Sequence, residues 1–137
     1  KDAVDRAIEI AKTRGAKRAL LLPVSAPFHC SLMQPAAEAM AEALGKVAVQ
    51  SPLVPVYANV TAGPVADPQE IIRLLIEQVT GTVRWRESIA AMADAGVERF
   101  VEFGGKVVGP MVKDITDKAT GTSVVSMADV EAIAASL

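Results

Sequence analysis

Helix-like and strand-like segments alternate along this chain, and glycines or prolines separate them. Apolar residues recur at helical spacing over 2–13, 31–45, 69–79, 82–96, 106–119 and from residue 128 onward, which predicts six helices. Short β-rich runs predict strands at 18–24, 54–60, 97–103 and 123–126, and the turn formers of 61–68 predict a loop. Strands that alternate with helices through short turns are typical of an α/β fold with a mostly parallel sheet.

Composition narrows the class of function. The chain has 137 residues, 51% apolar and 22% charged, which is typical of a globular domain. A net charge of -2, one Trp, one Tyr and three Phe do not suit a nucleic-acid partner. No apolar stretch approaches the roughly 20 residues that span a bilayer, and the N-terminal pattern is a charged amphipathic helix rather than a signal peptide. We therefore expect a cytoplasmic protein with no membrane partner.

The first residue already lies beside a helical pattern, with no starting Met and no capping side chain before it. We expect the chain to begin in the middle of a larger protein.

The only histidine, His29, and the only cysteine, Cys30, stand side by side in "LLPVSAPFHCSLM". One cysteine cannot form an internal disulfide, and one His with one Cys is too little for an ordinary zinc site, so we expect no metal. His29 falls in a connection that leaves a predicted strand, a common location for positioned chemistry.

Four motifs carry a resemblance to a known family. They are "GAKRALLLPVSAPFHCSLM" (15–33), "VPVYANVTA" (54–62), "EQVTGTVRWRESI" (77–89) and "GVERFVEFGGKVV" (96–108). In this order and spacing, the chain resembles the C-terminal part of the malonyl-CoA:acyl-carrier-protein transacylases of fatty acid and polyketide synthesis. The family usually has Gly-Pro-Gly-Lys in the last motif, whereas this chain has Gly104-Gly105-Lys106.

The resemblance implies an α/β-hydrolase-like core that carries a small ferredoxin-like subdomain. Residues 1–24 would be the last helix and strand of the small subdomain, and residues 25–137 would be the C-terminal part of the core. The family's nucleophilic serine, in a Gly-x-Ser-x-Gly turn, and its carboxylate-binding arginine lie upstream. The chain contains no Gly-x-Ser-x-Gly, so by itself it is expected to be inactive.

The resemblance also assigns roles to residues present here. His29 would be the general base for the serine, since imidazole suits proton transfer in both directions near neutral pH. The main-chain carbonyl of Gln78 would hold the other ring N–H. Phe28 would wall the acyl pocket. Malonyl-CoA, an acyl carrier protein and the N-terminal segment of the same enzyme would be the partners; the CoA thioester is a substrate, and no cofactor is implied.

Several alternatives stay open at this point. Cys30 could be a nucleophile paired with His29, although a small packed residue fits better. "GGKVVG" (104–109) could be a phosphate-binding turn of a flavodoxin-like domain, or only a structural turn. Arg84 and Arg86 could be solvated, or could contact a carrier protein or CoA phosphates. Asn59 is expected to cap a turn near the active site. The whole chain could also be a non-catalytic interaction module.

Overall fold

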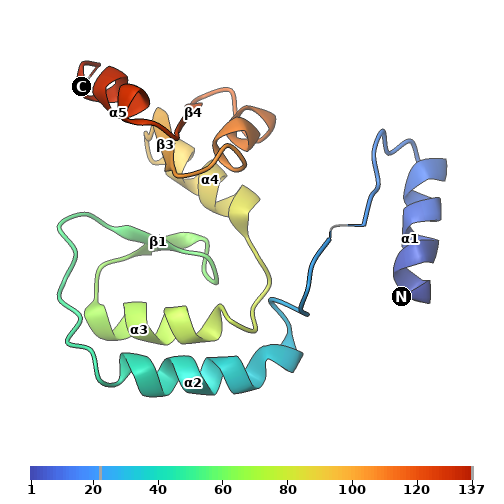
Figure 1. Ribbon diagram of the computed structural model, residues 1–137, viewed down its shortest axis with the longest axis horizontal. Coiled ribbons are helices and arrows are strands. Elements are labelled where there is room, and N and C mark those ends of the chain that lie inside the picture. The colour runs from blue at the N-terminus through green and yellow to red at the C-terminus, as the bar shows by residue number, and fades with distance from the viewer. Residues whose placement is uncertain (22, 137) are drawn as a thin grey trace.

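The computed structural model describes residues 1–21 and 23–136. The helices are α1 (Asp2–Thr13), α2 (Gln34–Leu44), α3 (Pro68–Glu77), α4 (Trp85–Asp94) and α5 (Met127–Ala134), with 3₁₀ helices η1 (Ser31–Met33) and η2 (Gly109–Asp114). The strands are β1 (Val56–Ala58), β2 (Gly63–Val65), β3 (Arg99–Phe103) and β4 (Thr120–Val124), arranged as shown in Figure 1. The predicted α/β content is confirmed.

The described strands form two small sheets rather than one. β1 and β2 make an antiparallel hairpin in which Tyr57 lies opposite Pro64. β3 and β4 are parallel, with Arg99 opposite Thr120 and Phe103 opposite Val124. The expectation of a mostly parallel sheet is met only by the second pair. β2 lies inside the stretch 61–68 that was expected to be a loop, and the last strand begins and ends earlier than the expected 123–126.

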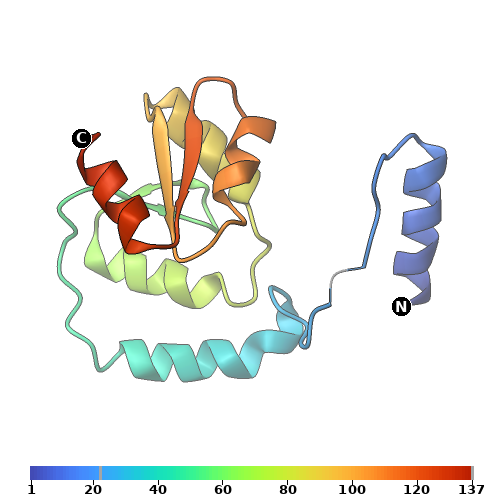
Figure 2. The ribbon, with the colours of Figure 1, turned by 45° about the horizontal axis from the view of Figure 1, so that its top comes forward.

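α3 lies between the β1–β2 hairpin and α2 (Figures 1 and 2). Leu74 of α3 and Ala37 of α2 are both buried. Burial of these apolar side chains is the main favourable term that holds the two helices together. The C-terminal end of α3 lies near His29, which precedes η1 and α2 in the chain.

A second cluster forms around β3 and β4. Its buried members are Ile89 and Ala93 of α4, Val112 of η2, and Ala119 before β4. The partly buried side chains packed against them are Trp85, Met92, Phe100 and Ile115. The cluster joins α4, η2 and the parallel pair into one packed unit.

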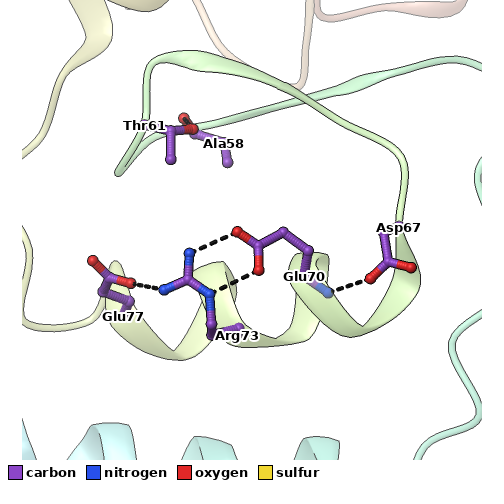
Figure 3. A network of polar contacts seen from close by, with 6 residues as sticks. All are labelled: Ala58, Thr61, Asp67, Glu70, Arg73 and Glu77. Atoms are coloured by element: carbon purple, nitrogen blue, oxygen red, sulfur yellow. Dashed lines mark hydrogen bonds and ion pairs between the residues drawn. The ribbon is translucent and has the colours of Figure 1, made fainter.

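Helix α3 has well-defined ends and a charged outer face. Asp67 caps it, since its carboxylate accepts the N–H of Glu70 at 2.8 Å. Arg73 lies between Glu70 and Glu77 and pairs with both (Figure 3). These ion pairs are exposed and follow helical spacing, so each stabilises the helix only slightly. The ion pairs follow the regular helical geometry of α3 as far as its last residue, Glu77.

The two largest differences from the predicted elements have physical causes. The expected strand 18–24 is absent at the described positions, since no strand pairs with it; Leu20, Leu21 and Val24 are exposed, and Leu22 lies outside the described residues. A strand needs a hydrogen-bonded partner to be stable. The expected helix over 106–119 is shortened to η2, because the chain turns after it: the Thr116 hydroxyl accepts the N–H of Lys118, and Thr120 already pairs with β3.

Helix α1 lies apart from the other elements in both views (Figures 1 and 2). It buries none of its residues, and Val4 and Ile10 are each about half exposed. Its amphipathic pattern therefore leaves an apolar side uncovered. Among the described helices, none is both long and apolar enough to cross a bilayer.

Candidate active site

The backbone at His29 adopts an uncommon conformation. Its φ is 58°, in the left-handed region, which a non-glycine residue enters at some cost and in which His is enriched. The preceding turn is tight, since the N–H of Phe28 bonds to the carbonyl of Ala26 at 3.0 Å. The Cys30 thiol donates to the carbonyl of Pro27 at 3.1 Å. Backbone strain of this kind is concentrated at functional sites, where it aims a side chain.

The imidazole of His29 is held by two main-chain oxygens. Its Nδ1 lies 3.1 Å from the carbonyl oxygen of Gln78 and 3.1 Å from that of Gly81. A carbonyl oxygen only accepts hydrogen bonds, so Nδ1 must carry the proton and donate to both. In the neutral ring, Nε2 then has the free lone pair. This is the tautomer that a general base requires.

Both oxygens come from the turn that ends α3. Gln78 caps the helix, and the N–H of Gly81 bonds back to the carbonyls of Glu77 and Gln78 at 3.1 and 3.2 Å. The last carbonyls of a helix have no partner within it and carry the negative end of its dipole. They suit the Nδ1–H of a histidine.

The structure brings two of the predicted residues together and adds a third. The contact between His29 and the main chain of Gln78 is present, while the Gly81 carbonyl was not expected. Nothing in a side-chain pattern marks a main-chain acceptor; the only clue was Gly81 itself, in a turn after a predicted helix. The catalytic roles of His29 and Gln78 stay predictions.

Asn59 links the exit of β1 to the segment that follows Gly81. Its Nδ2 donates to the carbonyl of Thr82 at 3.1 Å, and its Oδ1 accepts the N–H of Arg84 at 2.7 Å. The Arg84 guanidinium in turn donates to the carbonyl of Val60 at 3.1 Å. The Arg84 side chain is therefore tied to this turn rather than fully solvated.

Phe28 is 56% exposed. A hollow of about 150 Å³ does lie near the site, between the hairpin and α3. It is lined by residues of β1 and β2, by Ile71, Leu74 and Leu75, and by Asn59 and Gln78 at one end. Gln78 thus has its carbonyl on His29 and borders an apolar space.

The backbone N–H groups of the glycine-rich turn at 104–109 bind a carboxylate of the same chain, that of Glu102. The Glu102 carboxylate accepts the N–H groups of Val107, Val108 and Gly109 at 2.8 to 3.2 Å. These amides are the donors that a phosphate would need. The turn is therefore structural, and the phosphate-binding alternative has lost its donors to Glu102.

The hydrogen bond from Gly109, followed by those from Val107, Val108 and Ser123, outweighs partial burial and lowers the pKa of the Glu102 carboxyl below the ordinary 4.5. A carboxyl whose pKa is lowered by folding stabilises the fold above its unfolded pKa. That stabilisation is lost as the pH falls through the folded pKa.

We expect Glu102→Gln to lower the free energy of unfolding at pH 7 and to weaken its dependence on pH in mild acid. The measurement is urea unfolding between pH 7 and pH 3, ~4 units that span the carboxylate range. The unfolding is monitored by the fluorescence of the only tryptophan, Trp85, which packs on the adjacent cluster. Glu98→Gln, an exposed neighbour just before β3, should keep the wild-type acid response. Equal acid responses of Glu102→Gln and wild type would refute the assignment.

Comparison with known proteins gives close relatives over nearly the whole chain. The malonyl CoA-acyl carrier protein transacylase of Escherichia coli (strain K12) is 43% identical over 124 residues, which are 90% of this chain and 40% of that protein. The enzyme of the same name from Bacillus subtilis (strain 168) is 44% identical over 113 residues, 82% of this chain and 36% of its own length. The chain is homologous to part of the malonyl CoA-acyl carrier protein transacylases. No family model matches the chain.

Solved transacylase structures agree with this relationship. The acyl-carrier-protein-S-malonyltransferase from Bartonella henselae superposes with a TM-score of 0.87 at 46% identity, over 98% of this chain and 43% of that one. A malonyl-transacylase in complex with its type II PKS acyl-carrier protein gives a TM-score of 0.88 at 34% identity, over 100% of this chain and 45% of that one. The chain spans less than half the length of the transacylases it matches.

Proposed function

We propose that this chain supplies the general base for transfer of a malonyl group from malonyl-CoA to the phosphopantetheine thiol of an acyl carrier protein. The observation that carries the proposal is the His29 ring, with Nδ1–H on two carbonyls and Nε2 free to accept a proton. The homology to transacylases supports the reaction, and the malonyl-transacylase solved in complex with its acyl-carrier protein supports the partner.

The proton follows a short cycle around His29. Nε2 takes the proton of a serine hydroxyl as its oxygen attacks the malonyl thioester, and returns that proton to the departing CoA thiolate. In the second half, Nε2 takes the proton of the phosphopantetheine thiol, whose sulfur attacks the malonyl-serine ester, and returns it to the serine oxygen. The carbonyls of Gln78 and Gly81 hold the imidazolium through Nδ1–H in both halves. A carbonyl dipole is a weaker partner than a carboxylate, which a reactive thioester tolerates.

The serine and the carboxylate-binding arginine belong, in this proposal, to an N-terminal segment of the same enzyme. The chain by itself is then inactive in transfer, since it has no Gly-x-Ser-x-Gly. Residues 1–24 would complete a ferredoxin-like subdomain and residues 25–137 an α/β-hydrolase-like core, in a cytoplasmic enzyme. The separate position of α1, with its uncovered apolar side, fits a helix that packs in a subdomain completed by other residues.

A graft tests the proposed function directly. This chain replaces the matching part of the Bartonella henselae enzyme, whose remaining residues supply the rest of the protein. We expect the graft to form a malonyl-enzyme ester with malonyl-CoA, seen by intact mass, and to pass it to an acyl carrier protein. A folded graft that forms no ester would contradict the proposal.

Phe28 is proposed to line the acyl pocket where a branched extender would place its methyl group. Phe28→Ser in the graft is expected to raise the ratio of methylmalonyl to malonyl transfer. One methyl group in a pocket is worth about 1–3 kcal/mol, so the change should be on the order of 10-fold to 100-fold. Phe103→Ser, at another exposed phenylalanine, is the matched control and should leave the ratio unchanged. An unchanged ratio in Phe28→Ser would remove Phe28 from the pocket.

A further inference from the structure

Asn59 is the only asparagine of the chain and is half-buried at the exit of β1. Its amide uses both ends on one segment of main chain, donating to the carbonyl of Thr82 and accepting from the N–H of Arg84. The two contacts fix which way the amide points, because only this orientation matches the donor with the acceptor on each side. The segment 82–84 is thereby tied to the hairpin.

Thr82 is joined directly to the oxygen that holds His29. The Gly81 carbonyl and the Thr82 N–H form one planar peptide unit, and the two backbone dihedral angles of Thr82 join this unit to the Thr82 carbonyl that Asn59 holds. The Gly81 oxygen lies 3.1 Å from Nδ1 of His29. A chain of contacts therefore runs from the Asn59 amide through Thr82 and Gly81 to the imidazole.

We propose that Asn59 is a positioning residue, which aims the Gly81 carbonyl at Nδ1–H of His29 and so fixes the tautomer with Nε2 free. Its catalytic consequence rests on the proposed function; the structural effect does not. Asparagine suits this task because its short side chain carries one acceptor and a donor group. Aspartate would keep an acceptor for Arg84 and would oppose the carbonyl of Thr82 with a second one.

Because the chain has one histidine and one asparagine, the histidine ring signals in an NMR spectrum belong to His29 alone. With ¹⁵N-labelled histidine, the ring nitrogens give two resonances that report the tautomer under alkaline conditions, in which an imidazole is neutral. For the unmodified chain we expect a protonated Nδ1, an unprotonated Nε2 and an observable ring proton. For Asn59→Ala we expect nitrogen shifts displaced toward the average of both tautomers, because only the Gln78 carbonyl then holds Nδ1–H.

Thr61→Ala is the matched control. Thr61 is exposed on the same turn, and its hydroxyl donates to the carbonyl of Ala58 at 3.4 Å rather than to the segment 82–84 (Figure 3). We expect it to keep the wild-type histidine resonances. A folded Asn59→Ala protein with wild-type nitrogen shifts, or the same displacement in both variants, overturns the positioning role.

Two further measurements keep the test decisive if Asn59→Ala does not fold. Asn59→Asp should displace the nitrogen shifts in the same direction, because the donor to Thr82 is gone; wild-type shifts would overturn the proposal. In the unmodified chain, the Arg84 amide should be protected from exchange with water, because the Asn59 Oδ1 accepts its N–H. An Arg84 amide that exchanges as fast as in an open chain would also overturn it.

The outcome is separable from that of the proposed function. An inactive graft whose histidine tautomer still depends on Asn59 would refute acyl transfer and leave the positioning role standing. An active graft whose histidine tautomer does not depend on Asn59 would support acyl transfer and refute the positioning role.

Discussion

His29→Ala in the graft is expected to lower the rate of malonyl transfer by about 10²- to 10⁴-fold, the usual contribution of a positioned general base. The serine hydroxyl is a poor nucleophile without a group that takes its proton. Gln78→Ala should stay within a few-fold of the wild type, because only the main-chain oxygen of Gln78 contacts the ring. The measurement is the initial rate of malonyl transfer to an acyl carrier protein at saturating malonyl-CoA.

The test compares the transfer rates of the His29→Ala and Gln78→Ala grafts. Comparable large losses would show that the Gln78 side chain takes part, which contradicts a main-chain role. A His29→Ala graft with near wild-type activity would remove His29 from the reaction. Cys30→Ala separates the remaining alternative: it should keep most activity, since the thiol donates to the carbonyl of Pro27 in the preceding turn.

Gly121→Ala is expected to give the largest loss of stability. A Cβ at this position of β4 would overlap the main chain of Gly109 and lie 3.1 Å from Cγ2 of Val112. Backbone cannot rotate out of the way as a flexible side chain can, so η2 would have to move, and with it the fully buried Val112. Overpacking typically costs about 1–3 kcal/mol and occasionally more; we expect the upper end.

Urea unfolding followed by Trp85 fluorescence measures this loss, because Trp85 packs against the cluster that contains Val112. Gly63→Ala is the control, since a Cβ on that strand glycine meets its nearest atom at 3.8 Å. It should change the midpoint little. Equal stability of Gly121→Ala and wild type would mean that η2 does not lie against β4 as described.

The pairing of His29 with Gln78 could be predicted because the family resemblance assigns a role to the Gln78 carbonyl. Gly81 could not, because a main-chain oxygen leaves no mark on the residue type, and its direction depends on how the turn after α3 closes. Asn59 was expected to cap a turn; its link to the segment 82–84 required knowing that β1 and the end of α3 lie together. Contacts between distant segments were the part that pattern alone could not supply.

Element prediction succeeded where local chemistry decides and failed where a distant partner does. α1, α3, α4 and α5 follow periodicity and capping, as with Asp67 and Ser126. The helix expected at 106–119 is shortened to η2, because Thr120 pairs with β3 and the chain must turn before it. The strand expected at 18–24 is not formed at its described residues, because a strand depends on a neighbour to pair with.

The lone imidazole donates from Nδ1 to two peptide oxygens and keeps Nε2 free. The ¹⁵N spectrum of the histidine ring in the unmodified chain, under alkaline conditions, tests this arrangement. We expect a single neutral tautomer with the proton on Nδ1. A ring protonated on Nε2, or one that averages between both tautomers as in free solution, would contradict it.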